Sequence, residues 1–222
     1  MPLHHFLALQ MAVFLVWNSA PATPATLAVV AGADHAHLNG AAVSEGATVY
    51  DGDRCSTEAG GMMLLRSEAS SFDLTEESAV IVRSQVDGAQ SMELELNRGT
   101  LTFRAGRAAA LEIAVQEALI RPANDVPTIG QVTIAGPKEL RIYARRGSLQ
   151  FSYGGDTQTI AEGESYRVIL DPPEDGTQKK EAVKNRRRRT FLLVAIGGGG
   201  AGVAAFILEN HKHKNVESPD HP

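Results

Sequence analysis

Histidine is missing from the long middle of this chain of 222 residues, with none between Leu38 and Asn210. The seven histidines are His4, His5, His35, His37, His211, His213 and His221. Cysteine is almost absent as well, and the single Cys55 excludes an internal disulfide framework. We expect it to be a buried thiol or to form an intermolecular disulfide, because no histidine is near in sequence to activate it as a nucleophile. The middle of the chain thus lacks most of the usual catalytic side chains.

Positive charge is also in short supply. The chain has 26 acidic against 21 basic residues, a formal net charge of −5, and this balance gives no general case for nucleic-acid binding. Its length allows one sizeable domain with appendages. Apolar segments stand at both ends of the chain, and each needs its own interpretation.

The N-terminal apolar run, Phe6 to Trp17, is too short to cross a membrane, which takes about 20 residues. It suits the apolar region of a signal peptide, and Ala20-Pro21-Ala22 has the small-x-small form of a cleavage site. No lysine or arginine precedes the run, although signal peptides usually carry one. We predict a signal peptide over residues 1–22, and an uncleaved anchor or a start at Met11 are the alternatives.

The second apolar run, Phe191 to Leu208, carries no charge and is just long enough to span a membrane. Glycines 197–200 argue against a helix in water, so we predict a transmembrane helix over residues 190–208. Gly198 and Gly202 form a small-xxx-small pair that could bring two copies together as a homodimer, or they are merely tolerated. A flexible glycine hinge between two short apolar patches is the alternative to a span. The polar tail, residues 209–222, is too short to bury a core.

Basic residues precede this second run, in a linker over residues 172–189 that ends with Arg186 to Arg189. Only Lys212 and Lys214 follow the run. The positive-inside rule would therefore place the middle of the chain in the cytoplasm, whereas a signal peptide would export it. The two signals conflict. We favour export, because a translocated domain can carry its flanking charges across.

The middle of the chain shows the alternation of apolar and polar residues that is typical of half-buried strands. Met92, Leu94 and Leu96 alternate with Glu93 and Glu95. The same pattern recurs at Leu101 and Phe103, Val132 and Ile134, Leu140 to Ala144, Leu149 to Tyr153, and Tyr166 to Leu170. The continuously apolar runs Met62 to Leu65 and Ala79 to Val82 suit strands covered on both faces.

Turn residues separate these runs, at Gly60-Gly61, Asp87-Gly88, Gly136-Pro137, Gly154-Gly155 and Gly163. We therefore predict an all-β domain over residues 39–171, an antiparallel sandwich or a roll resembling a jelly roll. Ala105 to Val115 is the best helix candidate, although the alternation of Leu111, Ile113 and Val115 weakens it.

Two six-residue segments of this domain are similar in sequence. Arg98-Gly99-Thr100-Leu101-Thr102-Phe103 matches Arg146-Gly147-Ser148-Leu149-Gln150-Phe151. Glycine supplies the positive φ of a tight hairpin, so we predict two similar hairpins with inward-pointing Leu and Phe. A pair of repeated ligand sites is the sharper alternative.

At these residues the chain resembles the FecR domain family. Val43 to Arg54 is similar to the family's first motif, with Ser56-Thr57 following where the family favours a threonine. Arg98 to Leu101 resembles its central strand, and Gly147-Ser148-Leu149 and Ile160 to Glu164 resemble its closing strands. The resemblance covers residues 43–170. It implies an all-β periplasmic domain without a catalytic role, the sensing part of a transmembrane signalling protein.

The chain departs from that family in one respect. Classical members carry a cytoplasmic anti-sigma segment ahead of a membrane span, whereas here we expect only the predicted signal peptide ahead of the β domain. Anti-sigma activity is therefore not carried over. The resemblance implies a bacterial inner-membrane protein with a periplasmic β domain, an orientation that the run Arg186 to Arg189 opposes.

Candidate sites in the sequence all have plainer interpretations, so we assign no catalytic, cofactor-binding or metal-binding residue. Asp51-Gly52-Asp53 lacks the other oxygen ligands of a calcium loop and is typical of a turn. His35-x-His37 and His211-x-His213 offer two imidazoles each, fewer than zinc usually takes, and are interpreted as flexible solvated ends. Glu93 with Glu95, and Glu162 with Glu164, fit the solvent side of strands better than a glycosidase pair.

Three hypotheses about function remain. We favour a membrane-tethered, non-catalytic module of the cell envelope that senses or binds another protein. A module that binds an envelope polymer or a small ligand is the second, although only four tyrosines, Tyr50, Tyr143, Tyr153 and Tyr166, could serve as stacking platforms. An enzyme with an unfamiliar site is the third.

Overall fold

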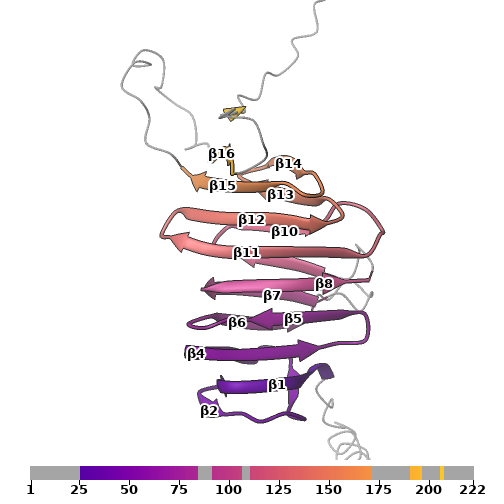
Figure 1. Cartoon of the computed structure of the whole chain (residues 1–222), viewed down its shortest axis with the longest axis vertical. Coiled ribbons are helices and arrows are strands. Elements are labelled where there is room, and N and C mark those ends of the chain that lie inside the picture. Colours follow the sequence, from indigo (N-terminus) through magenta and orange to yellow (C-terminus); the bar gives the residue numbers. More distant parts are fainter. Residues whose placement is uncertain (1–25, 85–91, 107–110, 172–190, 197–205, 208–222) are drawn as a thin grey trace, which may run out of the picture.

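The computed structural model describes residues 26–84, 92–106, 111–171 and 191–196, together with the backbone of 206–207. All its elements are β-strands, so the predicted all-β class is confirmed. Apart from one parallel pair, neighbouring strands are antiparallel. They build a tall stack with the strands lying across its long axis (Figure 1).

The strands form two stacks, which we call the front and the rear stack after their places in Figure 1. In hydrogen-bonded order the front stack is β1 (Thr26–Leu38), β4 (Arg54–Arg66), β5 (Ser70–Leu74), β8 (Thr100–Ala105), β11 (Thr128–Gly136), β12 (Glu139–Arg146), β15 (Ser165–Leu170), β16 (Phe191–Ala195) and β17 (Phe206–Ile207). The rear stack is β6 (Ala79–Ser84), β7 (Met92–Arg98), β9 (Leu111–Val115), β10 (Ala118–Pro122), β13 (Leu149–Tyr153) and β14 (Asp156–Ile160). Two short strands, β2 (Ala41–Ala42) and β3 (Thr48–Tyr50), pair with β1 at the lower end.

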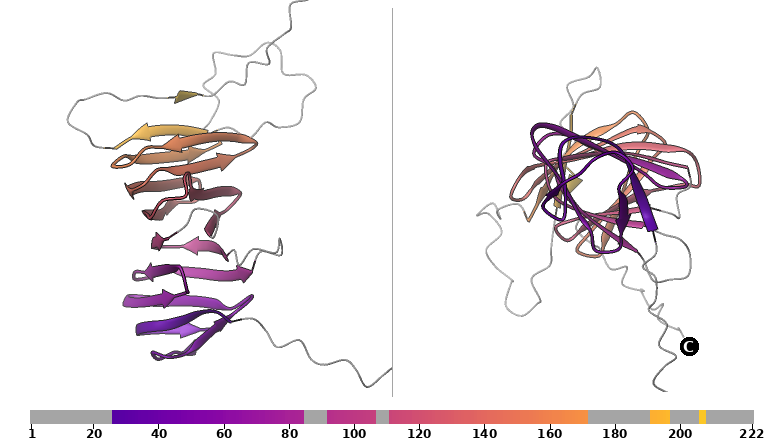
Figure 2. Two further views of the ribbon diagram at one scale, coloured as in Figure 1. Left: turned by 90° about the vertical axis from the view of Figure 1, so that its right-hand side faces the viewer. Right: turned by 90° about the horizontal axis from the view of Figure 1, so that it is seen from below.

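The long strand β4 joins the two stacks into one curled sheet. Its first residues pair with β6 of the rear stack, and its last residues pair with β5 of the front stack. The two stacks are therefore parts of a single sheet and not the two separate sheets of a sandwich. Seen from below, the strands curl around the long axis (Figure 2).

The core lies between the two stacks and is built from the inward positions that alternation predicts. Phe72, Phe103 and Phe151 are fully buried, with aliphatic side chains from both stacks around them. Alternation is confirmed for Met92–Leu96, Leu101–Phe103, Leu140–Ala144 and Leu149–Tyr153, whose apolar members are buried. Burial of a large apolar side chain contributes about 1.5–3 kcal/mol, so these residues are the main source of stability.

Two predictions about the lower strands are wrong. Met62 to Leu65 is not covered on both faces, because Met62 is 46% exposed while Met63 and Leu65 are fully buried. Gly60-Gly61 does not end a strand but lies inside β4, where Gly60 has a φ of +70°. The glycines fall between the part of β4 that pairs with the rear stack and the part that pairs with the front stack.

The described part of the sheet already includes Thr26–Leu38, ahead of the expected start at residue 39. Strand β1 pairs along β4 and buries Ala28, Val30 and Ala36. His35 and His37 therefore lie in a strand and not in a flexible end. The small side chains of this strand gave the alternation too little contrast to be recognised.

The two Arg-Gly segments lie at corners where the chain passes from one stack to the other, and not in hairpins. Gly99 and Gly147 have φ values of +81° and +69°, as predicted. However, the strands on either side of Gly99, β7 and β8, do not pair with each other but with other strands. The same is true of β12 and β13, on either side of Gly147. Each glycine lets the chain cross between the rear and front stacks, and the Leu and Phe that follow it point inward, as predicted.

The C-terminal apolar run also differs from expectation. Phe191–Ala195 forms strand β16, which pairs with β15, and Phe191 packs edge-on against Phe151 at a ring-centroid distance of 4.9 Å. Within the part of the chain that is described, no helix is long and apolar enough to cross a membrane. A purely apolar run has no periodicity that separates a buried strand from a helix, and tertiary pairing decided the outcome for these five residues.

Several expectations lie outside the described residues. These are the signal peptide over 1–22, the basic linker 172–189, the Gly198–Gly202 contact, the tail 209–222 and the turn at Asp87-Gly88. The helix candidate Ala105 to Val115 is described only in part, and its residues Leu111–Val115 form strand β9.

Candidate functional site

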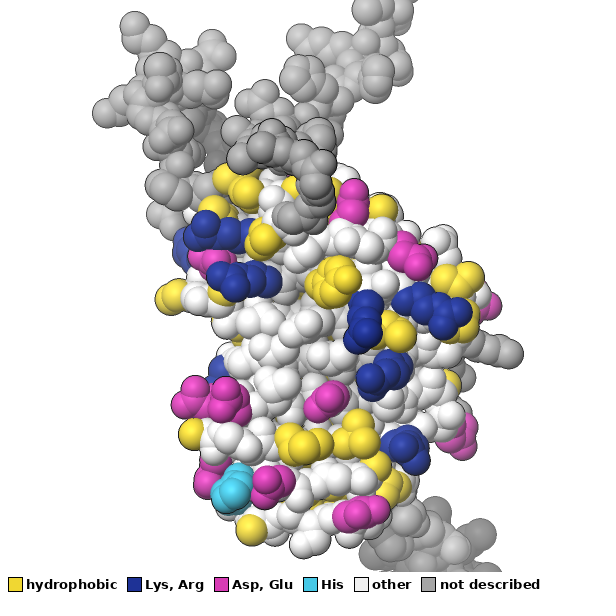
Figure 3. Space-filling view, in the orientation of Figure 1, with side chains coloured by type: hydrophobic (Ala, Val, Ile, Leu, Met, Phe, Trp, Pro, Cys, Tyr) yellow, Lys and Arg dark blue, Asp and Glu magenta, His cyan; other side chains and the backbone are white. Residues whose placement is uncertain are grey.

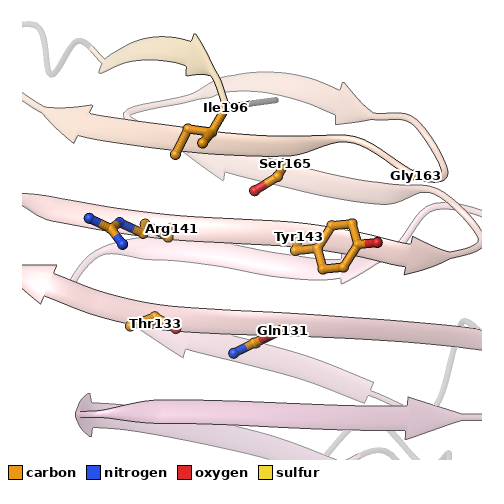
Figure 4. Close-up of a pocket in the computed structure, with 7 residues that line it drawn as sticks. All are labelled: Gln131, Thr133, Arg141, Tyr143, Gly163, Ser165 and Ile196. Atoms are coloured by element: carbon orange, nitrogen blue, oxygen red, sulfur yellow. The ribbon is translucent and has the colours of Figure 1, made fainter. Parts of the chain in front are cut away.

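A shallow depression of about 450 Å³ lies on the outer face of the front stack, over strands β11, β12 and β15 (Figure 4). Its lining residues are Gln131, Thr133, Arg141, Tyr143, Gly163, Ser165 and Ile196. Strand alternation places them there. In β12, Leu140, Ile142 and Ala144 point into the core, so Arg141 and Tyr143 between them point outward.

Sheet register brings these side chains together. Arg141 lies directly across from Thr133 on one side, and Tyr143 lies across from Gln131. On the other side Tyr143 faces Ser165, and Ile196 joins the rim through the bond from its backbone N–H to the carbonyl of Ser165, 2.7 Å long. Tyr143 is 36% exposed, so its ring is partly available to a ligand.

Electrostatics at the rim are set by a surface ion pair. Arg167 donates two hydrogen bonds of 2.7 Å to the Glu139 carboxylate, and these bonds hold the pKa of that carboxyl below its ordinary value. Arg141 lowers the same pKa further through its charge. Because both partners of the pair are accessible to water, it contributes little to stability.

The side chains that line the depression can bind polar groups, but they do not include a nucleophile with a neighbouring base. It offers one guanidinium, one phenol, one amide and two hydroxyls, with no imidazole, thiol or carboxylate among the lining residues. Hydrogen bonding and stacking on Tyr143 are the chemistry it supports. Sequence reasoning noted Tyr143 as a possible stacking platform but missed Arg141, although the alternation around it was already visible.

Residues that the sequence offered as candidate ligands lie elsewhere. Asp51-Gly52-Asp53 forms the turn between β3 and β4, as predicted, and the Asp53 carboxylate accepts bonds from the Tyr50 N–H and the Asn39 side chain. His37 lies 3.6 Å from the Glu58 carboxylate, and His35 lies 3.0 Å from that of Asp34. No group of three or more potential metal ligands occurs among the residues that the structure describes.

The paired glutamates divide into two cases. Glu95 accepts bonds from Arg83 on the outer face of the rear stack, and this contact lowers its carboxyl pKa. Glu164 lies in the turn before β15, where its carboxylate accepts bonds from the Ala161 N–H and the Tyr166 hydroxyl. Both carboxylates therefore have structural partners.

Cys55 is fully buried and free, as expected, and desolvation is the main cause that raises the pKa of its thiol to about 12. We predict that this thiol does not react with a disulfide reagent at pH 8 in the native protein and reacts fully once urea unfolds the chain. The folded pKa exceeds the ordinary value of 9.0, so its contribution to stability is full below pH 9 and is lost between about pH 9 and 12. Rapid native labelling in a thiol assay would contradict the burial of Cys55.

No protein-family model matches the chain, and no curated protein matches it. Two crystal structures of a candidate anti-sigma factor from Parabacteroides distasonis ATCC 8503 are similar, at 11% identity and with TM-scores of 0.44 and 0.42. Each match covers 52% of this chain and 54% of the other, so the chain spans about half the length of those neighbours.

Proposed function

We propose that this chain is a non-catalytic, FecR-like module of the cell envelope that senses or binds another protein through the free edge of strand β14. The observation that carries the proposal is that β14 pairs with β13 on one side and has no partner strand on its other side among the described residues. A free strand edge accepts an extended segment of a partner as an additional strand.

The geometry of the β13–β14 hairpin identifies the free backbone groups. Gly154 and Gly155 both have positive φ, +63° and +95°, which is the signature of a type I′ turn. Tyr153 and Asp156 close this turn as a hydrogen-bonded pair, so Thr157 and Thr159 occupy the non-hydrogen-bonded positions. Their backbone N–H groups therefore point away from β13, toward the open edge.

The other end of the stack is protected in a way that β14 is not. At the lower end the edge strands β2 and β3 have only two and three residues, and very short edges discourage pairing with another chain. Strand β14 has five residues, and its outward side chains include Thr157 and Thr159, which suit a strand. The upper end is thus the better site for a partner.

Location in the envelope is part of the same proposal. It is supported by the apolar run Phe6 to Trp17 with Ala20-Pro21-Ala22 behind it, and by the FecR-like motifs at residues 43–54, 98–101 and 160–164. A binding module for an envelope polymer or small ligand is the second candidate, and the depression around Arg141 and Tyr143 favours it.

Crosslinking in cells tests the proposal directly. We expect a photo-crosslinking amino acid at Gln158, a half-buried position of the edge strand β14, to yield a discrete adduct with one protein, and the same probe at the exposed Glu45, near the lower end, to yield none. Thr157→Pro and Thr159→Pro remove the outward N–H groups without touching the bonds to β13, so each should abolish the adduct.

Two controls complete this experiment. Thr157→Val keeps the backbone N–H and loses only the hydroxyl that lies 3.0 Å from Ser152, so it should retain the adduct. The proline variants should keep the circular dichroism spectrum of the parent protein. An adduct that persists in both folded proline variants would rule out strand addition at β14.

A further inference from the structure

A second groove, of about 410 Å³, lies at the ends of strands β4, β8 and β12 on the front stack. Three arginines line it: Arg66, Arg104 and Arg146. Space-filling shows Lys and Arg side chains following one another up the right-hand side of this face (Figure 3). The chain as a whole has a net charge of −5, so this gathering of positive charge does not follow from composition.

Sheet register places the three arginines in one line. Arg66 lies across from Ser71, and Ser71 lies across from Arg104. Arg104 lies across from Ile129, which in turn lies across from Arg146. All five side chains therefore share the outer face, and an arginine recurs on every second strand.

The three arginines differ from other arginines of the surface in their ion pairing. Among the described residues none of them takes part in an ion pair, whereas Arg83, Arg121 and Arg167 elsewhere on the surface are each paired with a glutamate. Of the described residues that line the groove, Glu68 alone is acidic. A row of like charges without partners is unfavourable by itself, and an anionic ligand would relieve that repulsion.

Spacing indicates what kind of anion fits. Strands in a sheet lie about 4.8 Å apart, so alternate strands put successive arginines about 10 Å apart and the whole row spans about 20 Å. Acidic side chains on one face of an extended peptide recur about every 7 Å, which does not match. A polysaccharide with one carboxylate on every second sugar has a charge spacing close to that of the arginines.

We propose that this arginine row binds an acidic polysaccharide lying along the long axis of the stack. Each guanidinium would take one carboxylate in a two-pronged hydrogen bond, which arginine makes better than lysine. The hydroxyl of Ser71, which lies between Arg66 and Arg104 in the register and is half-buried in the same groove, is placed to bond a sugar hydroxyl between the charges. This inference does not rest on the proposed function, because the groove and strand β14 lie on different stacks.

Calorimetric titration of the full chain with hyaluronate oligosaccharides, which carry one carboxylate per disaccharide, tests the inference. We expect affinity to rise with length up to about three disaccharides, one per arginine, and then to level off. Each of Arg66→Gln, Arg104→Gln and Arg146→Gln should weaken binding about fivefold, and the triple variant should lose it. Arg83→Gln, which removes an arginine of the rear stack that is paired with Glu95 and lines neither groove, is the matched control and should bind normally.

Further arms separate this ligand from other anions. Arg104→Lys keeps the charge but cannot form the two-pronged hydrogen bond of a guanidinium. We expect this variant to bind more weakly than the parent and more tightly than Arg104→Gln. The proline variants of β14 should leave hyaluronate binding unchanged, so a failure of one proposal does not imply failure of the other. Unchanged binding by a folded triple variant, or equal affinity for polyglutamate or for anionic lipid vesicles, would overturn the polysaccharide assignment.

Discussion

Replacing Gly99 by alanine is expected to destabilise this protein by about 3 kcal/mol or more, at the upper end of what single substitutions cost. Gly99 has a φ of +81°, where a side chain costs about 1–2 kcal/mol. A Cβ atom added there would also lie 2.5 Å from the Cα of Ser78 and overlap its hydroxyl. The larger part of the effect should come from this overlap.

Ser78 cannot move aside without losing its own bonds. It is fully buried, its backbone N–H donates to the Thr57 hydroxyl at 3.0 Å, and its own hydroxyl accepts a bond from the Thr100 N–H at 2.9 Å. Any shift would leave buried polar groups without partners, which costs about 1–3 kcal/mol for each group. This is why the clash at Gly99 should not relax.

Gly52→Ala is the matched control for backbone strain alone. Its φ of +83° is nearly the same, and nothing lies within 4 Å of the position of an added Cβ. It should therefore cost only about 1–2 kcal/mol. Urea unfolding followed by fluorescence or circular dichroism measures both variants, and equal midpoints for the two would contradict the contact between Gly99 and Ser78.

Truncating Phe103 to alanine is expected to cost about 3–5 kcal/mol, because its ring is fully buried between the stacks. Tyr143→Ala, whose ring is 36% exposed, is the control and should cost much less. Thermal unfolding and urea unfolding should agree on this order. A cost below about 1 kcal/mol for Phe103→Ala would mean that the ring does not fill the core.

A double-mutant cycle makes this second prediction more specific. A Cβ atom added at Gly130 would lie 2.5 Å from Cζ of Phe103 and 3.1 Å from a methyl of Leu149, so Gly130→Ala alone should destabilise. The variant Phe103→Leu replaces the ring by a shorter side chain and so removes the contact with Cζ. The double variant should therefore be more stable than the sum of the two single effects predicts, and strict additivity would show that the two residues are not in contact.

The sequence predicted the positions of the strands far better than it predicted which strands pair with one another. Alternation at Met92–Leu96 or Leu149–Tyr153 reports which side chains point inward, because a strand repeats every two residues and burial follows the same period. Positive φ at Gly99 and Gly147 was also predictable, because only glycine adopts it cheaply. Neither signal says which strand pairs with which, and so two corners were interpreted as hairpins.

The grooves on the surface were not predictable for a related reason. Arg66, Arg104 and Arg146 are distant in sequence, and each stands at the end of a strand as an ordinary exposed arginine. Only the register, through Ser71 and Ile129, shows that they form one row. The same holds for Tyr143 and Ser165, which lie across from each other in β12 and β15.

By itself, then, the sequence determined the all-β class, the inward faces of the central strands and the positive φ of the corner glycines. Each of these follows from local period and local backbone sterics. Tertiary structure alone decided that β4 pairs with both stacks on either side of Gly60-Gly61, that Phe191–Ala195 pairs with β15, and that β14 has no second partner strand among the described residues. These depend on hydrogen bonds between residues far apart in the chain, whose energies no local pattern records.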